Sequence, residues 1–459
     1  ILQEAFKKFI LNFFIFIRCI SYLKLKFQRY QSINLKILSE RIFLFGIFLL
    51  ATSMSIGIFL ILIGSIVSLI NRKENPLKER WSFFLMTIST LMVVSCLYQT
   101  ISQSNAELDE WNISLTWIGL LNWIPFFYLF ISIKDFLRTT EQRLRVSILL
   151  LSGSIPVLIT GFGQYFFNWE GPISLLNGLI TWYLKPIEPH LGLSGLFSNQ
   201  NYAGTWMSLI WPLSLSLFFI NKVNVYKRII ALLILFLLTF AIILTTSRNA
   251  LFGLIISIPI IMGIKSLLII LGILLLLLFL IYSQASLPFS ENLIGLLSSI
   301  LPPQFINKFN KFDLINILEY RRINLWKNSI ELIATKPLFG LGAASFPILY
   351  ELYYQPKFYT EEHTHNLFLE ISAGYGFLVS SMLLFFIFSL IYFSWRKLNS
   401  GTFNPKESII NRSWLASTVV LLSSQMNDIT YYDGRISVML WVLLSGLKNM
   451  IKEKDFKKI

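Results

Sequence analysis

Two of the three histidines in the chain lie two residues apart, in the polar segment 361–366, Glu-Glu-His-Thr-His-Asn. An almost unbroken apolar run follows His365, so we expect a helix to begin here with Thr364 as its N-cap. The partial positive charge of a helix N-terminus disfavours imidazolium, which keeps the His365 ring neutral and able to accept a proton near pH 7. The sequence therefore predicts a general base at His365, with Asn366 orienting the ring or a substrate hydroxyl.

Two other interpretations of this segment are open. Glu361, Glu362, His363 and His365 supply four potential metal donors, but a His-x-His pair on a helix would point its rings to different faces. The histidines could also be structural groups that form hydrogen bonds at an interface. Because no further cluster of histidine or cysteine supports a metal site, we predict no metal and no cofactor, and we assign His363 and Asn366 supporting roles.

Arginines near the ends of apolar segments form the second group of candidates. Arg248 lies between two apolar runs, and Arg322 follows Arg321 at the start of an amphipathic segment. A planar guanidinium binds two phosphate oxygens at once, so Arg248 and Arg322 are candidates to hold a phosphate-linked substrate. Alternatively, Arg248 snorkels to the membrane surface and the Arg321–Arg322 pair is merely solvated. Asn201 precedes another apolar run, where it is either an interfacial residue or part of the same external cavity.

The amino-acid composition indicates the structural class of the protein. The chain has 459 residues, of which 55% are hydrophobic and only 14% charged. A soluble protein of this size could not bury so many apolar side chains. We therefore predict an all-α, polytopic membrane protein.

Apolar runs long enough to cross a bilayer number about twelve. The expected spans are 38–53, 54–70, 81–98, 114–133, 146–163, 203–220, 229–246, 249–264, 266–283, 365–394, 412–428 and 435–449. The first two are the least separable, because 42–70 reads either as one long tilted helix or as two short ones.

The distribution of basic residues sets the orientation. Most of the 39 Lys and Arg residues fall in segments that alternate with the spans in a way that places both termini in the cytoplasm, as the positive-inside rule requires. The net charge of +15 is therefore a topology signal, and no nucleic-acid partner is needed to explain it. The predicted division is a basic cytoplasmic segment 1–37, spans one to nine in 38–283, a large periplasmic loop 284–364, spans ten to twelve in 365–449, and a cytoplasmic tail 450–459.

The large loop between spans nine and ten carries its own helical pattern. Ile323, Trp326, Ile330 and Ile333 recur at helical spacing with polar residues between them. This pattern predicts an amphipathic helix that is ended by the segment 336–342, Lys-Pro-Leu-Phe-Gly-Leu-Gly. A loop of this length more often carries function than not.

Several motifs, in this order along residues 190–430, resemble those of the O-antigen ligase and O-antigen polymerase superfamily of bacterial membrane proteins. They are Gly195-Leu196-Phe197-Ser198-Asn199-Gln200-Asn201, Ser247-Arg248, Arg322-Ile323-Asn324-Leu325-Trp326, Pro337-Leu338-Phe339-Gly340-Leu341-Gly342, and His365-Asn366 followed after nine residues by Gly376. In the ligases two threonines follow that last glycine, whereas this chain has Ser380 and Ser381, shifted by one place.

The resemblance implies a metal-independent, inverting glycosyltransferase in the bacterial inner membrane, with its site facing the periplasm. The implied donor is a glycan on undecaprenyl pyrophosphate, bound through Arg248 and Arg322, and His365 deprotonates the acceptor hydroxyl. In a ligase of lipopolysaccharide biosynthesis the acceptor is the lipid A core, and in a polymerase it is another lipid-linked repeat unit. A transporter of a small anion such as bicarbonate is the alternative from another class, although transporters usually place their sites near the membrane midplane.

Overall fold

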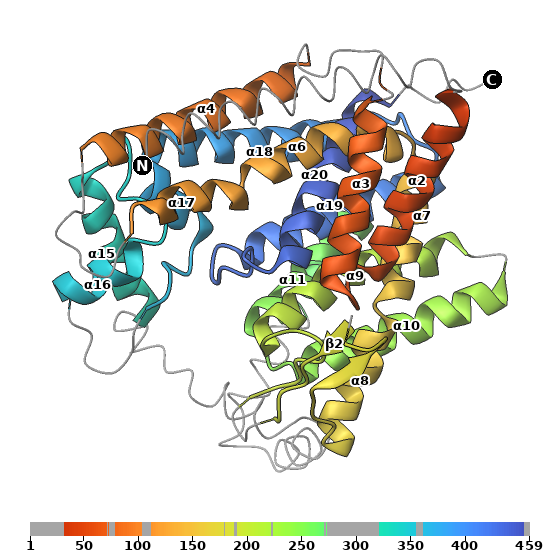
Figure 1. Cartoon of the computed structure of the whole chain (residues 1–459). Helices are drawn as coiled ribbons and strands as arrows, with labels where there is room; N and C mark the ends of the chain where they lie inside the picture. The colour runs from red at the N-terminus through yellow and green to blue at the C-terminus, as the bar shows by residue number, and fades with distance from the viewer. Residues whose placement is uncertain are drawn as a thin grey trace.

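The computed structural model describes residues 32–70, 72, 79–102, 112–178, 180–187, 191–221, 224–269, 272, 321–354 and 361–453, with the side chains of residues 32–34 and 321 left out. The chain is mostly helical over this part (Figure 1). Its helices are α2 (Ser32–Leu49), α3 (Met54–Ile70), α4 (Arg80–Ile101), α5 (Ser114–Gly119), η2 (Leu120–Asn122), α6 (Ile124–Ser132), η3 (Ile133–Phe136), α7 (Thr140–Gly153), α8 (Ile155–Phe167), α9 (Gln200–Ile220), α10 (Val225–Leu244), α11 (Arg248–Met262), α15 (Arg321–Thr335), α16 (Phe346–Tyr354), α17 (Leu367–Tyr375), α18 (Phe377–Asn399), α19 (Pro405–Ser424) and α20 (Gly434–Lys452).

Six segments of this part of the chain are long and apolar enough to cross a membrane. They are Arg80–Ile101, Ser114–Phe136, Thr140–Phe167, Gln200–Ile220, Val225–Leu244 and Phe377–Asn399, and Met54–Ile70 and Arg248–Met262 are shorter apolar helices. A mostly helical, polytopic membrane protein is therefore confirmed. The ninth predicted span, 266–283, lies almost entirely outside the described residues, as do 284–320 of the large loop.

The apolar run 42–70 forms two helices, not one. α2 and α3 pack against each other as a hairpin, and the chain turns between Leu49 and Met54. Glycine allows this close approach: a Cβ on Gly57 would lie 2.7 Å from the Cα of Leu50, and one on Gly64 would lie 2.9 Å from the carbonyl oxygen of Ser39. The backbones of the two helices therefore touch where larger residues would hold them apart.

Three helices that the sequence predicts as continuous are interrupted, although Ser114–Phe136 and Thr140–Phe167 are each still long and apolar enough to be one span. Gly376, at φ +93°, separates α17 from α18, so 365–394 is not one span. Ser154 divides 146–163 into α7 and α8, and Trp123 interrupts 114–133 after a short 3₁₀ turn. A two-stranded antiparallel hairpin, β1 (Ile173–Leu175) and β2 (Ile180–Trp182), is a small exception to the all-α prediction.

The best-buried helices form the centre of the bundle. α9, α19 and α11 pack on one another, and α20 packs against α6, α18 and α19. Trp206, Trp414 and Trp441 are completely buried in this core. The α19 and α20 helices carry many polar residues, which their protein neighbours shield.

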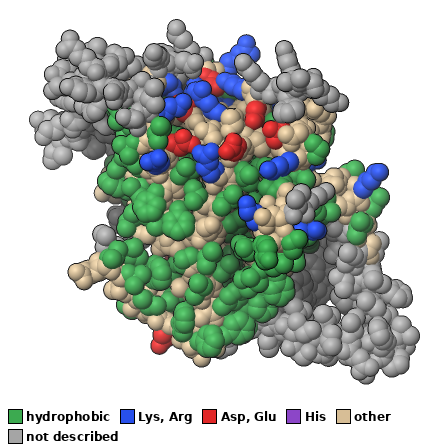
Figure 2. All heavy atoms as spheres, turned by 90° about the vertical axis from the view of Figure 1, so that its right-hand side faces the viewer, with side chains coloured by type: hydrophobic (Ala, Val, Ile, Leu, Met, Phe, Trp, Pro, Cys, Tyr) green, Lys and Arg blue, Asp and Glu red, His purple; other side chains and the backbone are tan. Residues whose placement is uncertain are grey.

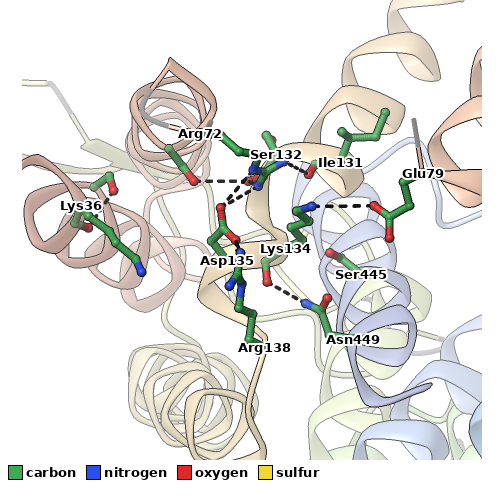
Figure 3. Close-up of polar contacts among 12 residues, drawn as sticks. Lys36, Arg72, Glu79, Ile131, Ser132, Lys134, Asp135, Arg138, Ser445 and Asn449 are labelled. Atoms are coloured by element: carbon green, nitrogen blue, oxygen red, sulfur yellow. Dashed lines mark hydrogen bonds and ion pairs between the residues drawn. The ribbon is translucent and has the colours of Figure 1, made fainter. Parts of the chain in front are cut away.

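Charged residues from distant segments meet at one end of the bundle, which we call the basic end (Figure 3). Arg72, after α3, donates to Asp135 at 2.8 Å and to the carbonyl oxygen of Ser132 at 3.0 Å. Glu79, before α4, forms an ion pair with the buried Lys448 of α20 at 3.2 Å. Lysine and arginine also gather with acidic side chains over the upper part of the face drawn in Figure 2.

The start of α7 and the start of α19 join the same basic end. Arg143, fully buried, donates to Asn411 Oδ1 at 2.9 Å and pairs with Glu453 after α20. Arg412 donates to the carbonyl oxygen of Ile260, near the end of α11, at 3.3 Å. The charge pattern predicts that the loops at or beside these segments lie on one side of the membrane. In the structure the segments meet at the basic end of the helix bundle.

The predicted external segments meet at the other end, which we call the histidine end. Gln99, near the end of α4, donates to the carbonyl oxygen of Gly374 at 3.0 Å. Tyr431, before α20, donates to the carbonyl oxygen of Asn122 at 2.8 Å. In Figure 1, α15 and α16 lie together on the left, beside the start of α17.

Candidate active site

The His365 ring forms a hydrogen bond with a carboxylate that the sequence argument did not assign to it. His365 Nδ1 lies 2.9 Å from Asp428 Oδ1, and His365 Nε2 lies 3.6 Å from Glu361 Oε2. With the proton on Nδ1, the imidazole donates to Asp428 and keeps the lone pair on Nε2. This arrangement orients a base and stabilises the imidazolium that forms when the base takes a proton.

The Asp428 carboxylate is held ionised. Burial favours the neutral acid, but the hydrogen bond from His365 and the charges of His365, Arg322 and His363 outweigh it and lower the pKa of Asp428 below its ordinary value. Asn201, in the first turn of α9, donates from Nδ2 to the second oxygen, Asp428 Oδ2, at 2.8 Å. Both carboxylate oxygens therefore have polar partners.

Three helices fix the turn that carries Asp428. Leu367 N, at the start of α17, donates to the carbonyl oxygen of Gln425 at 2.9 Å. Asn366 Nδ2 donates to the carbonyl oxygen of Met426 at 3.1 Å, and Arg322 Nη1, from α15, donates to the carbonyl oxygen of Asn427. The turn 425–428 is thus attached to α17 and α15, and through Asn201 to α9.

The helix cap predicted at Thr364 is wrong. Asn366 is the N-cap of α17: its Oδ1 accepts from Phe368 N at 3.0 Å and from Leu369 N at 3.3 Å. Among the described residues the Asn366 amide bonds to Met426, Phe368 and Leu369 and not to the His365 ring. α17 begins at Leu367, two residues later than a cap at Thr364 would place it, and Asp428 instead of a helix end contacts His365 Nδ1.

His365 itself has an unusual backbone, with φ +53°. Its N–H donates to His363 Nδ1 at 3.3 Å, and the two rings lie edge to face with centroids 4.3 Å apart. Burial and the neighbouring His365 lower the pKa of His363, so this ring is neutral near pH 7. The loop that carries the two histidines is also bonded to α17, because Thr364 N donates to Glu370 Oε2 at 3.0 Å.

The predicted amphipathic helix is present as α15, and it places Arg322 beside the histidine pair. Trp326 Nε1 donates to the carbonyl oxygen of Thr364 at 3.1 Å, while Arg322 reaches Asn427. One face of α15 therefore contacts both segments that carry His365 and Asp428. Arg321 begins this helix, and its side chain lies outside the described residues.

Arg248 is the first residue of α11 and is exposed. Just before it, Thr246 Oγ1 donates to Gln200 Oε1 at 3.3 Å, and a Cβ on Gly204 would lie 2.9 Å from the Ser247 Cβ. The chain before Arg248 therefore packs on the first turn of α9, the same turn that sends Asn201 to Asp428. The start of α11, with Arg248, therefore lies at the histidine end, and the binding of phosphate by Arg248 stays a prediction.

The segment 199–201 has more specific roles than interfacial polarity. Asn199 Oδ1 caps α9, accepting from Asn201 N at 2.9 Å and from Tyr202 N at 3.1 Å. Gln200 Oε1 accepts from Thr246 and also from Gly192 N. The three polar side chains thus cap a helix, join it to the residues before α11, and fix the carboxylate of Asp428.

Gly340 explains the close packing of the turn after α15. Gly340 has φ +73°, and a Cβ there would lie 2.7 Å from the backbone nitrogens of Tyr375 and Gly376. Phe377 N donates to the carbonyl oxygen of Pro337 at 2.8 Å, and Leu341 N to that of Ala373 at 2.6 Å. Backbone packs on backbone here, so the segment 336–342 clamps α15 onto the break between α17 and α18.

The other charged residues of this turn pair with each other. Arg435 forms an ion pair with Asp433 at 2.5 Å and lies over the Phe197 ring at 3.7 Å. This leaves Asp428 to His365 and Asn201. The predicted topology could have identified Asp428 as a candidate partner of His365, because it is an acidic residue at the external end of a predicted span.

Part of this chain matches a known protein family. Residues 233–384 match the protein-family model described as O-antigen ligase. The matched segment contains Arg248, Arg322, His365 and Gly376, whereas Asn201 and Asp428 flank it. No curated protein matches the chain. The match covers residues 233–384 of the 459-residue chain and supports the resemblance to the O-antigen ligase superfamily that the motifs indicate.

Proposed function

We propose that the chain transfers a glycan from a polyprenyl pyrophosphate, such as undecaprenyl pyrophosphate, to an acceptor hydroxyl at the periplasmic face of the inner membrane. The observation that carries the proposal is the 2.9 Å hydrogen bond between His365 Nδ1 and Asp428 Oδ1, with Arg322 beside it. A base oriented by a carboxylate and flanked by a guanidinium suits the attack of an alcohol on a carbon whose leaving group is a phosphate.

In this mechanism His365 Nε2 takes the proton of the acceptor hydroxyl. The hydroxyl oxygen forms a bond to the anomeric carbon, and the bond from that carbon to the phosphate oxygen breaks, with inversion. The pyrophosphate leaves with the electron pair, and Arg322 and Arg248 stabilise its charge. Asp428 stabilises the imidazolium during the step.

An apolar cavity of about 270 Å³ next to the base supports a lipid-linked donor. It lies between α17, α18, α19 and α20, and Leu367 and Met426, each two residues from a member of the His365–Asp428 pair, line it. Leu383 and Ile387 of α18 line it deeper along the helix. In this proposal the cavity takes part of the isoprenoid chain while the pyrophosphate lies at the arginines.

The test is transfer by purified protein supplied with lipid-linked glycan and candidate acceptors, the lipid A core for a ligase or a second lipid-linked unit for a polymerase. We expect His365→Ala to lower the rate by about 10²- to 10⁴-fold, the usual contribution of a general base. Arg322→Lys keeps the charge but loses the planar fork, so it should also be impaired. Lys327→Ala, at an exposed position on the same helix, is the matched control.

Full activity of His365→Ala, at wild-type protein levels in the membrane, would show that the base is elsewhere. Uptake of a labelled anion into vesicles, dependent on Arg248 and without glycan transfer, would favour the transporter instead.

A further inference from the structure

We propose that His363, His365 and Asp428 bind a divalent transition-metal ion of the zinc class, and that the bound ion inhibits transfer by occupying His365. The inhibition rests on the proposed function, but the binding does not. The inference is therefore tested in two separate arms.

The geometry of the three side chains fits such an ion. One ligand atom from each, two imidazole nitrogens and a carboxylate oxygen, all lie within 4.8 Å of one another. Zinc takes this donor set at about 2.0–2.2 Å, with neighbouring ligand atoms about 3.3 Å apart in a tetrahedron. Binding therefore requires side-chain rotations that shorten the separations of the ligand atoms from the range below 4.8 Å toward this value.

The objection that the sequence raised against a metal site does not hold in the structure. It assumed that His363 and His365 lie on a helix, which would send their rings to different faces. Both precede α17, and the positive φ of His365 turns its ring back toward His363, so that the ring centroids are 4.3 Å apart. The third ligand, Asp428, comes from a turn 63 residues away, where no spacing rule could find it.

The surroundings support a cation at this point. Asn201 fixes the second oxygen of Asp428 at 2.8 Å, the kind of outer contact that orients a metal ligand. Glu361, buried, places Oε2 3.6 Å from His365 Nε2 and adds a negative charge beside the cluster. The carboxylates of Glu361 and the exposed Glu362 also lie close to the histidines, and Arg322 is the guanidinium that acts on Asp428.

Binding and base catalysis use the same group. An imidazole nitrogen that coordinates a metal has no lone pair left for the acceptor proton, and a metal bound to Asp428 removes the carboxylate from the ring. The metal-free site is therefore the active one, and an occupied site is blocked until the ion leaves.

The binding arm uses the purified full chain, stripped with a chelator and titrated with Co²⁺, whose visible spectrum reports tetrahedral nitrogen and oxygen ligands. We expect one Co²⁺ per chain, displaced by Zn²⁺. His363→Gln and Asp428→Asn should each weaken binding by at least about tenfold, whereas Lys327→Ala should bind as wild type. An absence of stoichiometric binding, or equal affinity in wild type and His363→Gln, would overturn the inference.

The activity arm measures transfer at increasing Zn²⁺ concentration. We expect inhibition over the concentration range in which Zn²⁺ displaces Co²⁺, and recovery on adding chelator. Each variant is compared with its own metal-free rate, and His363→Gln should need at least about tenfold more Zn²⁺ for half inhibition. Stimulation by Zn²⁺ would overturn the inhibitory role. A chain that binds Co²⁺ as expected but transfers no glycan in the absence of metal would leave the binding intact and refute the proposed function.

Discussion

Asn201 donates from Nδ2 to Asp428 Oδ2 at 2.8 Å, and this single bond connects the first turn of α9 to the turn between α19 and α20. The other oxygen of Asp428 meets His365. The position of the proposed base, His365, therefore depends indirectly on Asn201 of α9, which bonds to Asp428 and not to the imidazole ring.

The first prediction concerns Asn201. A hydrogen bond to a charged acceptor contributes about 1.5–3 kcal/mol, so Asn201→Ala should lower kcat by roughly tenfold or more while the protein still folds. Asn201→Asp should lower it further, because two carboxylates would then share one contact. Steady-state kinetics of both variants test this, and an Asn201→Asp enzyme as active as wild type would contradict the role.

Asp428→Asn is the second prediction. The amide keeps the shape of the carboxylate but carries no charge to stabilise the imidazolium, so we expect kcat to fall by about 10²-fold or more. The KM for the donor should change little, because Asp428 acts on the base and makes no contact with the leaving group. A large rise in KM with kcat unchanged would assign Asp428 to binding.

Gly376 gives the third prediction. A Cβ at this position would collide with the carbonyl oxygen of Leu338, and its φ of +93° is unfavourable for alanine. Gly376→Ala should lower the free energy of unfolding by at least about 1–3 kcal/mol and separate α15 from α17, with loss of transfer. Gly401→Ala is the control, because Gly401 has φ +73° but its Cβ would meet nothing within 4 Å. Equal thermal stability of the two variants in detergent would show that the Leu338 contact is unimportant.

The cavity provides the fourth prediction. Leu383, only 2% exposed, lines it, and Leu383→Trp would fill it. Transfer from a donor with a long isoprenoid chain should fall by roughly tenfold, while a donor with a short chain should lose less. Phe385→Trp is the matched control on the lipid-facing side of α18, at 66% exposure. Equal losses with both donors would exclude the cavity as the chain site.

The fifth prediction concerns pH and stability. The pKa of His363 is lowered in the folded state, mainly by burial and then by His365. The unfolded chain therefore binds this proton first, and the folded state loses stability as the pH falls below 6.5, the ordinary pKa of histidine. The Tm in detergent should fall more between pH 7.5 and 5.5 for wild type than for His363→Gln. An equal fall in both would assign the pH dependence to other groups.

Much of the architecture could be predicted from the sequence because it depends on local patterns. The apolar runs predicted the helices, and the spacing of Ile323, Trp326, Ile330 and Ile333 predicted α15 to within a few residues. The breaks were missed, since Gly376 and Ser154 interrupt apolar runs that remain hydrophobic on both sides.

The site was predictable only in part, for a related reason. His365 and Arg322 stand out as rare polar groups beside apolar runs, so their types and positions were informative. Asp428 and Asn201 reach the ring through tertiary packing, and no periodicity carries that contact. The choice between Thr364 and Asn366 as the cap could not be made either, because both side chains are good caps and the helix start differs by only two residues.

The contact between Arg322 and the Asn427 carbonyl has a consequence for the order of events. The same guanidinium is proposed to receive the diphosphate and already restrains the turn that aims Asp428 at its imidazole. A phosphate oxygen that competes for this guanidinium would weaken its hydrogen bond to the turn. Binding of the donor is therefore coupled to the orientation of the base.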